Sequence, residues 1–130
     1  MNIEQLEKIL KPYWAKGWDG YCRFDSGWSD LVYELHNKIT EIEPNYKLNQ
    51  IKEKFGILRF YCEFDDYFLP ENSDKRNAID TLVEEYQKYS GSKCEICGDP
   101  GTMHYKKRWM KTLCPVCAEK ELYVKRISMD

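Results

Sequence analysis

The chain has 130 residues, the size of one ordinary domain or of a small domain with an appendage. It is 42% hydrophobic and 15% aromatic, enough for a modest core, and no apolar run is long enough to cross a membrane. A formal net charge of −2 excludes a general attraction to nucleic acid or acidic lipid. The charge is uneven, because residues 1–90 carry 12 basic against 17 acidic side chains and residues 91–130 carry 8 against 5.

The N-terminal stretch MNIEQLEKILKPYW has early acidic residues and no apolar run, so we expect neither a signal peptide nor a transit peptide. Ile3, Leu6, Ile9 and Leu10 recur at helical spacing, and Pro12 ends the short helix that they predict. Six cysteines without an export signal indicate a reducing compartment, where C-x-x-C pairs bind metal or carry redox chemistry. We therefore expect a cytoplasmic protein.

Residues 13–28 form a glycine-containing segment that is unusually rich in aromatic side chains, and we expect a loop here. The aromatic residues are Tyr13, Trp14, Trp18, Tyr21, Phe24 and Trp28. Most of these rings are expected to cover a core, because a solvated loop of this composition would be unstable; a recognition surface is the alternative. Cys22 within this loop is expected to be a free thiol.

A helix is predicted to follow, from about residue 28 to Pro44, with Ser26 or Gly27 near its cap. One apolar stripe runs along it: Trp28, Leu31, Val32, Leu35, Ile39 and Ile42. His36 borders this stripe, and we interpret it as a packed or surface residue and not as a ligand.

From Tyr46 to Phe64 the apolar residues alternate, which predicts two strands joined near Phe55-Gly56. One face of the second strand carries Leu58, Phe60, Cys62 and Phe64, so Cys62 is expected in the core. A turn centred on Phe55-Gly56 places Ile51 opposite Phe60.

The same pairing places Lys52 opposite Arg59 on the other surface, an unfavourable arrangement of like charges unless an anion or a partner lies between them. We therefore predict a site for an acidic or phosphate-bearing group. Its residues are Lys52, Lys54, Arg59 and Tyr61. Two alternatives stay open: the acidic residues at 63, 65 and 66 could neutralise the face, or a three-residue loop with a bulge could shift the register.

A third helix is predicted after Ser73, and Gly91 fits the left-handed position that ends many helices. Its apolar stripe consists of Ala78, Ile79, Leu82, Val83, Tyr86 and Tyr89. The serines that flank Gly91 mark a boundary, so we expect an α+β body with a small antiparallel sheet at 1–91 and a separate segment at 92–130.

Four cysteines, Cys94, Cys97, Cys114 and Cys117, follow the pattern C-x2-C-x16-C-x2-C, which suits one tetrahedral zinc ion. Gly98 permits the tight turn after the first pair. Thioredoxin-like redox chemistry is the rival for a single C-x-x-C, but two spaced pairs argue against it. The sequence therefore predicts a structural Zn²⁺ site.

Between the pairs, residues 105–113 are expected to form a hairpin, and Pro115 fits the first turn of a helix. That helix is expected to continue through Ala118 and Leu122 toward Val124 and Ile127. A knuckle, a hairpin and a helix that carries the second pair resemble a treble-clef zinc finger.

The hairpin of this finger is basic, and nucleic-acid binding is one interpretation of it. The side chains concerned are Lys106, Lys107, Arg108, Trp109 and Lys111. The other interpretation is local: four thiolates and one Zn²⁺ leave a charge of about −2, which nearby cations offset.

Nuclease activity is a third hypothesis, because many treble-clef fingers with flanking cysteine pairs belong to HNH nucleases. Such enzymes need further histidine or asparagine ligands on the helix to hold a catalytic metal. This hairpin offers His104 alone, and the helix CAEKEL has no histidine, so the resemblance ends at the zinc site. We expect a protein that is not an enzyme.

The hairpin IKEKFGILRFY, the preceding GWSDLVYELHNKITEIEPNYKLNQ and the cysteine pairs together resemble a group of small uncharacterised phage and prophage proteins. Their typical hairpin is V-K-E-K-F-G-G-L-R-F-Y, so Ile51 and Ile57 are departures here. The resemblance covers about residues 27–62 and, more loosely, 94–118, and it brings no known activity. It implies an accessory protein in bacterial cytoplasm, of a kind that often inhibits host defence or modulates host machinery. The sequence thus predicts a binding protein for a host protein or a small anionic, nucleotide-like ligand, with nucleic acid as the alternative partner and no membrane association.

Overall fold

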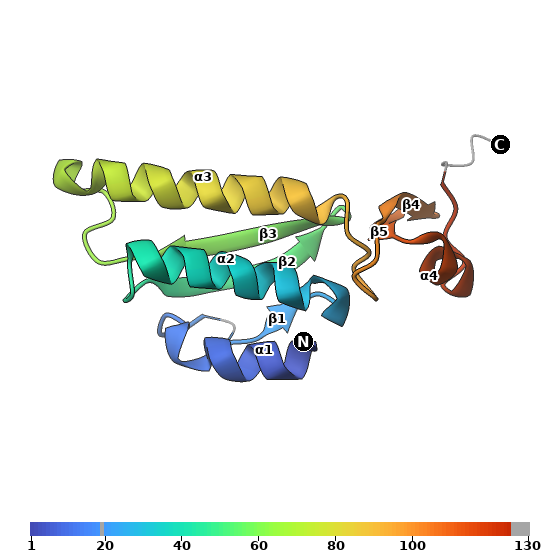
Figure 1. Cartoon of the computed structure of the whole chain (residues 1–130), viewed down its shortest axis with the longest axis horizontal. Helices are drawn as coiled ribbons and strands as arrows, with labels where there is room; N and C mark the ends of the chain where they lie inside the picture. Colours follow the sequence, from blue (N-terminus) through green and yellow to red (C-terminus); the bar gives the residue numbers. More distant parts are fainter. Residues whose placement is uncertain (19, 126–130) are drawn as a thin grey trace.

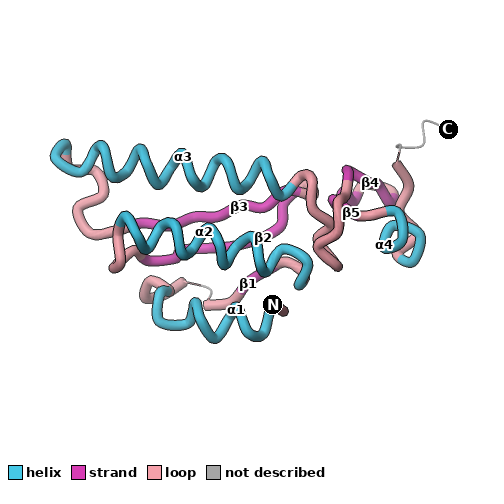
Figure 2. The backbone as a smooth tube through the Cα atoms, viewed as in Figure 1, coloured by secondary structure: helices cyan, strands magenta, loops and turns pink. Residues whose placement is uncertain are grey.

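The computed structural model describes residues 1–18 and 20–125. These residues form four α-helices and two small β-sheets, which confirms the α+β class (Figures 1 and 2). The first helix, α1 (Ile3–Leu10), forms where the helical spacing predicted it, and a short 3-10 turn at Lys11–Tyr13 that includes Pro12 follows it. No helix in the described ranges is both long and apolar enough to span a bilayer.

The larger sheet has three strands in the order β1 (Cys22–Arg23), β2 (Lys47–Lys54) and β3 (Ile57–Glu63). β2 and β3 pair antiparallel as predicted, but β1 pairs parallel to β2, so the expectation of a wholly antiparallel sheet is wrong. A strand of two residues is too short to show the alternation by which strands are recognised in a sequence. The segment that was expected to be only a loop therefore contributes an edge strand.

The turn between β2 and β3 is as short as predicted. Phe55 and Gly56 are its central residues, with φ angles of 55° and 79°, and two positive φ values are the mark of a type I′ hairpin turn. Ile51 accordingly pairs with Phe60, and Lys52 pairs with Arg59. The predicted register is confirmed, and the three-residue alternative is excluded.

Two helices, α2 (Ser29–Ile42) and α3 (Ser73–Ser90), lie side by side and cover the apolar face of this sheet (Figures 1 and 2). Both were predicted from their apolar stripes. Gly91 has a φ of −69°, so the prediction of a left-handed residue at the end of α3 is wrong. The core that these elements share includes Trp28, Leu35, Ile39, Tyr46, Ile51, Leu58, Phe60 and Ile79.

The aromatic residues of the 13–28 segment divide between the core and the surface. Trp28 and Phe24 are buried, and Tyr13 and Trp14 pack against the core as half-buried residues. The remaining two, Trp18 and Tyr21, are about half exposed. The core interpretation therefore holds for four of the six rings.

The C-terminal part has a hairpin of β4 (Thr102–Lys106) and β5 (Trp109–Leu113), followed by α4 (Pro115–Lys120). α4 is shorter than predicted because Leu122 takes a left-handed backbone with a φ of 62°, and Val124 instead pairs with Tyr105 of β4. The predicted continuation over these two residues is wrong, and Ile127 lies outside the described residues. A second small core gathers here, around Cys94, Leu113, Cys114, Cys117 and Ala118.

Candidate metal centre and cationic sheet face

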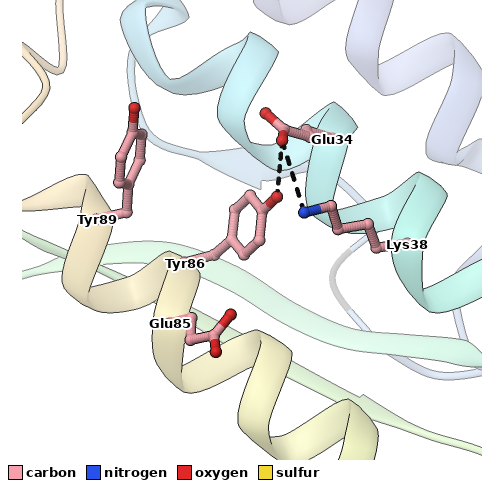
Figure 3. Close-up of a pocket in the computed structure, with 5 residues that line it drawn as sticks. All are labelled: Glu34, Lys38, Glu85, Tyr86 and Tyr89. Atoms are coloured by element: carbon pink, nitrogen blue, oxygen red, sulfur yellow. Dashed lines mark hydrogen bonds and ion pairs between the residues drawn. The ribbon is translucent and has the colours of Figure 1, made fainter.

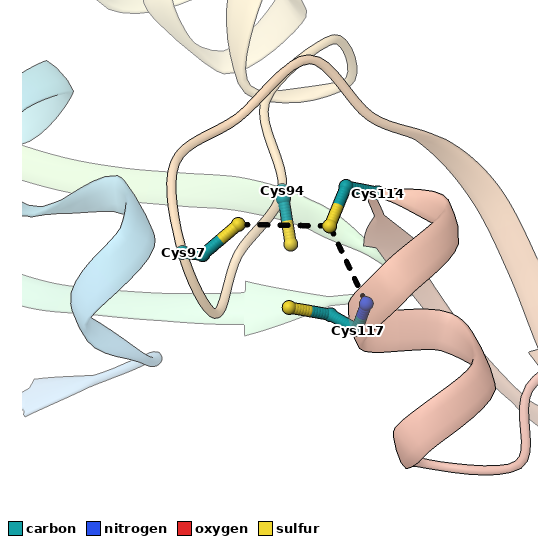
Figure 4. A group of neighbouring side chains, drawn as sticks. All are labelled: Cys94, Cys97, Cys114 and Cys117. Atoms are coloured by element: carbon teal, nitrogen blue, oxygen red, sulfur yellow. Dashed lines mark hydrogen bonds between the residues drawn. The ribbon is translucent and has the colours of Figure 1, made fainter.

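The four predicted ligand cysteines converge at one point. Cys94 and Cys97 lie on the loop before β4, and Cys114 and Cys117 lie at the start of α4 (Figure 4). All four Sγ atoms lie within 4.8 Å of one another, and Sγ of Cys97 is 3.6 Å from Sγ of Cys114. This cluster could hold a metal ion.

Local backbone geometry brings each pair of cysteines together. After the first pair, Gly98 has a φ of 86° and donates its N–H to the Cys94 carbonyl at 2.8 Å, which closes the knuckle. In the second pair, Cys114 is the N-cap of α4, and the Cys117 N–H points at its sulfur at 3.4 Å (Figure 4). This N–H lowers the pKa of Cys114 to about 7, so the residue has the thiolate character that a metal ligand needs.

The two remaining cysteines lie outside the cluster. Cys22 lies on β1 and Cys62 on β3, and both are free thiols, as expected. Burial raises the pKa of each to about 12, so both stay protonated at neutral pH. They are packing residues and not ligands.

The first knuckle is also the point where the cysteine segment docks on the body. The Gly27 N–H donates to the Glu95 carbonyl at 2.7 Å, and the Trp28 Nε1–H donates to the Lys93 carbonyl at 2.9 Å. The two backbones touch, because a Cβ on Gly27 would lie 2.2 Å from the Cys94 carbonyl oxygen. The start of α2 is therefore held by the segment that carries the first cysteine pair.

A buried carboxylate lies in this contact. Glu95 is only 2% exposed, and its Oε2 accepts the Asp25 N–H at 3.0 Å. Burial raises the pKa of Glu95 to about 7. Lys111 lies beside it and forms an ion pair with Asp25 at 3.3 Å. Lys111, predicted as a possible nucleic-acid contact, is thus engaged within the molecule.

Comparison of the chain with models of protein families, with curated proteins and with solved structures finds no match. No activity is therefore transferred from a relative. The candidate sites are argued from their own residues.

The second candidate site lies on the face of the three-stranded sheet that is opposite to the core. Directly paired residues share a face, so Lys52 and Arg59 point away from the side on which Ile51 and Phe60 are buried. The parallel strand adds a third cation, because Arg23 pairs with Lys52. A row of three cations, Arg23, Lys52 and Arg59, therefore crosses all three strands, and we call it the cation row.

Lys52 and Arg59 are not neutralised in the way that one sequence alternative expected. Among residues 1–18 and 20–125, no carboxylate lies within 4.0 Å of the charged atoms of Lys52 or Arg59. The Arg23 guanidinium stacks on the Tyr21 ring, 5.0 Å from its centroid. Like charges thus face one another across the strands.

A shallow hollow of about 320 Å³ adjoins the row at the far end of the strands, lined by Trp18, Asn49, Gln50, Tyr61 and Glu63. Tyr61, one of the four predicted site residues, is 46% exposed here. Asn49 contributes a buried Nδ2 without a hydrogen-bond partner in the described residues. This hollow places an aromatic ring and a free amide donor beside the cations.

Lys54, the remaining predicted residue, lies on the same face but near the hairpin turn, with its Nζ 5.8 Å from the centre of the Phe55 ring. The basic residues of the β4–β5 hairpin also lie toward this end: a cleft joins Lys54 and Phe55 to Arg108 and Trp109. Lys107 is exposed at the turn of that hairpin, and Lys106 stacks on Tyr123. Sequence reasoning treated the two basic patches as separate, whereas the fold brings their ends together.

Another hollow, of about 270 Å³, lies between α2 and α3, but its polar groups are paired (Figure 3). The Tyr86 hydroxyl donates to Glu34 at 2.9 Å, and Lys38 forms a weak ion pair with the same carboxylate at 3.8 Å. With its main donors and acceptors satisfied internally, this hollow is a weaker candidate than the sheet face.

Arg23 and Phe55 are the residues of these sites that sequence reasoning missed. Arg23 joins the cation row only through the parallel pairing of β1 with β2, for which the sequence carries no local signal. Phe55 was identified as a turn residue, but its ring is 62% exposed beside the finger hairpin. Only the docking of the C-terminal segment on the body reveals that position.

Proposed function

We propose that this protein is a non-catalytic, zinc-stabilised binding protein whose cation row receives a phosphate-bearing ligand. In keeping with the resemblance to phage and prophage proteins, we propose that it acts as an accessory protein in bacterial cytoplasm, with host defence or host machinery as its target. The cation row carries this proposal, because opposed like charges become favourable when an anion lies between them.

Zinc is the metal that we propose for the cysteine cluster, in a treble-clef finger. A tetrahedral ion with Zn–S bonds of about 2.3 Å separates its sulfurs by about 3.8 Å. The 3.6 Å between Sγ of Cys97 and Sγ of Cys114 fits that edge. Four sulfur donors also favour zinc over hard cations such as Mg²⁺, which prefer oxygen. Its role is to hold the knuckle and α4 together.

A phosphate group suits the row better than an isolated carboxylate does. Two of the three cations are arginines, whose planar guanidinium groups bind phosphate oxygens with two parallel hydrogen bonds. Tyr61 and Trp18 offer ring faces beside the row for the rest of a nucleotide-like ligand. The acidic surface of a host protein is the alternative partner, and it would use the same charges without the rings.

The environment of His104 favours a structural role over a catalytic one. This histidine is 3% exposed within β4, and its Nδ1 lies 2.8 Å from the Thr102 carbonyl oxygen. The α4 helix, with the sequence PVCAEK, supplies no histidine for a catalytic metal. These features support the hypothesis that the finger does not cleave nucleic acid.

The test is a ligand-induced shift in thermal stability, with pyrophosphate and ATP as probes. Wild-type protein should gain RT ln(1 + [L]/Kd) in its free energy of unfolding, and Arg59→Ala and Lys52→Ala should each reduce that gain. Lys88→Ala is the matched control, because Lys88 is an exposed cation on α3, which covers the opposite face of the sheet. If the gain survived Arg59→Ala and Lys52→Ala, the cation row would not be the binding site.

A further inference from the structure

The β2–β3 turn packs against strands β4 and β5 where the C-terminal segment docks on the body. The Thr112 hydroxyl of β5 donates to the Gly56 carbonyl at 2.8 Å, and Met103 of β4 packs against the same glycine so closely that a Cβ there would lie 2.7 Å from its sulfur. The finger hairpin is therefore fixed against the β2–β3 turn. Between them is a cleft of about 260 Å³, lined by Glu53, Lys54, Phe55, Arg108, Trp109 and Met110.

Two exposed aromatic rings border this cleft. Trp109 is 71% exposed and Phe55 is 62% exposed, although each ring would gain free energy from burial. Phe55 also has a left-handed backbone, at a turn position where Asn or Gly is usual. Neither the packing of the molecule nor the geometry of the turn accounts for a phenylalanine there, which points to a contact outside the chain.

The charge around the rings is positive. Lys54 extends over the Phe55 ring, and Lys107 and Arg108 are exposed on the finger side. Glu53 is the acidic residue in the lining, and its carboxylate is half-buried and accepts the Gly56 N–H. An anionic ligand is therefore favoured over a cationic or neutral one.

The cleft is continuous with the cation row. Lys54 follows Lys52 by two residues on the same face of β2, which places the two side chains about 7 Å apart. Cations therefore extend from Arg59 and Lys52 through Lys54 to the two rings. Cations next to exposed rings match single-stranded nucleic acid. Its phosphates contact Lys and Arg, and its unpaired bases stack on aromatic side chains.

We propose that the cleft binds an unpaired base of single-stranded nucleic acid between Phe55 and Trp109, while the neighbouring phosphates lie on Lys54 and the cation row. This inference rests on the proposed phosphate site and extends it to a polynucleotide. Duplex DNA fits the arrangement poorly, because its bases are already stacked on one another and their faces are not accessible. An acidic protein segment would engage the cations but would leave the rings unused.

The experiment is fluorescence anisotropy with a labelled 12-nucleotide oligo(dT), a duplex of the same length, and a polyglutamate peptide as competitor, all with zinc-loaded protein. Trp109→Ala and Phe55→Asn test the rings, and asparagine suits the left-handed turn position, so this variant should keep the hairpin. Phe68→Ala is the matched control: Phe68 is 86% exposed in the β3–α3 connection, at the end of the body opposite the finger (Figure 1). Zinc content and thermal unfolding establish that each variant is folded.

We expect the single strand to bind more tightly than the duplex, and each ring variant to weaken binding about tenfold while Phe68→Ala leaves it unchanged. Lys54→Ala should make the slope of log K against log salt concentration less steep, by the amount that corresponds to about one phosphate contact. Ring variants that bind as wild type, equal affinity for the duplex, or equal competition by polyglutamate would each overturn the inference. If the wild-type protein still binds pyrophosphate when one of these results is found, the proposed phosphate site stands and only the extension to nucleic acid is overturned. If the wild-type protein does not bind pyrophosphate, the phosphate site and its extension are both overturned.

Discussion

At the scale of single residues, the body contains a buried polar contact between α2 and the start of β2. His36 is 3% exposed, and its Nδ1 lies 2.5 Å from the Tyr46 hydroxyl, with the Tyr13 ring packed edge-on 4.5 Å from the imidazole. Burial lowers the pKa of His36 and raises that of Tyr46, so the imidazole stays neutral and can accept a hydrogen bond from the protonated tyrosine hydroxyl. The histidine is thus a packed residue, as its place beside the apolar stripe predicted.

This contact makes stability depend on pH. Because the folded protein disfavours protonated His36, the unfolded chain takes up a proton first, below the ordinary histidine pKa of about 6.5. The contribution of His36 to the free energy of unfolding should therefore fall as pH decreases from about 6.5, by up to about 1 kcal/mol over the first pH unit. Glu95, whose pKa is raised to about 7, contributes in the opposite direction, so the His36 effect is the difference between wild type and His36→Gln. Urea unfolding of both proteins at pH 7.5, 6.5 and 5.5 measures this difference, and an identical pH dependence in the variant would refute the assignment.

At the scale of elements, the approach of the knuckle to the start of α2 leaves no room for a side chain at Gly27. The Gly27→Ala variant would place a methyl group 2.2 Å from a carbonyl oxygen of the backbone, which cannot rotate away. We expect a loss of about 3 kcal/mol in the free energy of unfolding. Gly17→Ala is the control, because Gly17 has a φ of 87° but open space around it, and it should lose only about 1 kcal/mol. Equal losses in the two variants would contradict the close docking.

Some of the helices, strands and site residues could be predicted from the sequence, and others could not. α2, α3 and β3 each repeat an apolar period over seven residues or more, and a recognisable short turn joins β2 to β3, so local pattern was sufficient to place them. β1 has two residues and no period, and Leu122 has helical spacing yet a left-handed backbone. The metal cluster was predictable because a two-residue spacer lets both sulfurs of a C-x-x-C pair bind the same ion. The burial of Glu95 was not predictable, since it depends on a hydrogen bond from the N–H of Asp25, which is 70 residues away in the sequence.

At the scale of the whole molecule, two separate hydrophobic cores are joined by a narrow contact. The body core lies between the sheet and its helices, and the smaller core surrounds the cysteines. We expect so small a core to depend on a bound metal for its stability, because metal-binding free energy there would be folding free energy. The body has a core of its own that does not include the four clustered cysteines.

Removing the metal should therefore act unequally on the two parts. With a chelator, or in Cys97→Ser, we expect amide hydrogen exchange to become fast over residues 94–120 while β2, β3 and α3 stay protected. Cys62→Ser is the control, since that thiol is remote from the cluster and should leave one metal ion bound per chain. Loss of protection throughout the body would show that the body also depends on the metal. Metal retained in Cys97→Ser would show that this cysteine is not a required ligand.

The contact between Trp28 and Lys93 has a consequence for the order in which the chain folds. It joins residues 65 positions apart, and the Asp25–Glu95 contact joins residues 70 apart, whereas β2 and β3 are neighbours across a two-residue turn. Contacts of large sequence separation form late because closing the loop costs entropy first. During synthesis, the first turn of α2 must wait for the knuckle to leave the ribosome. We expect the nascent body to acquire its hairpin early and its last hydrogen bonds only when the cysteine cluster has bound its proposed metal.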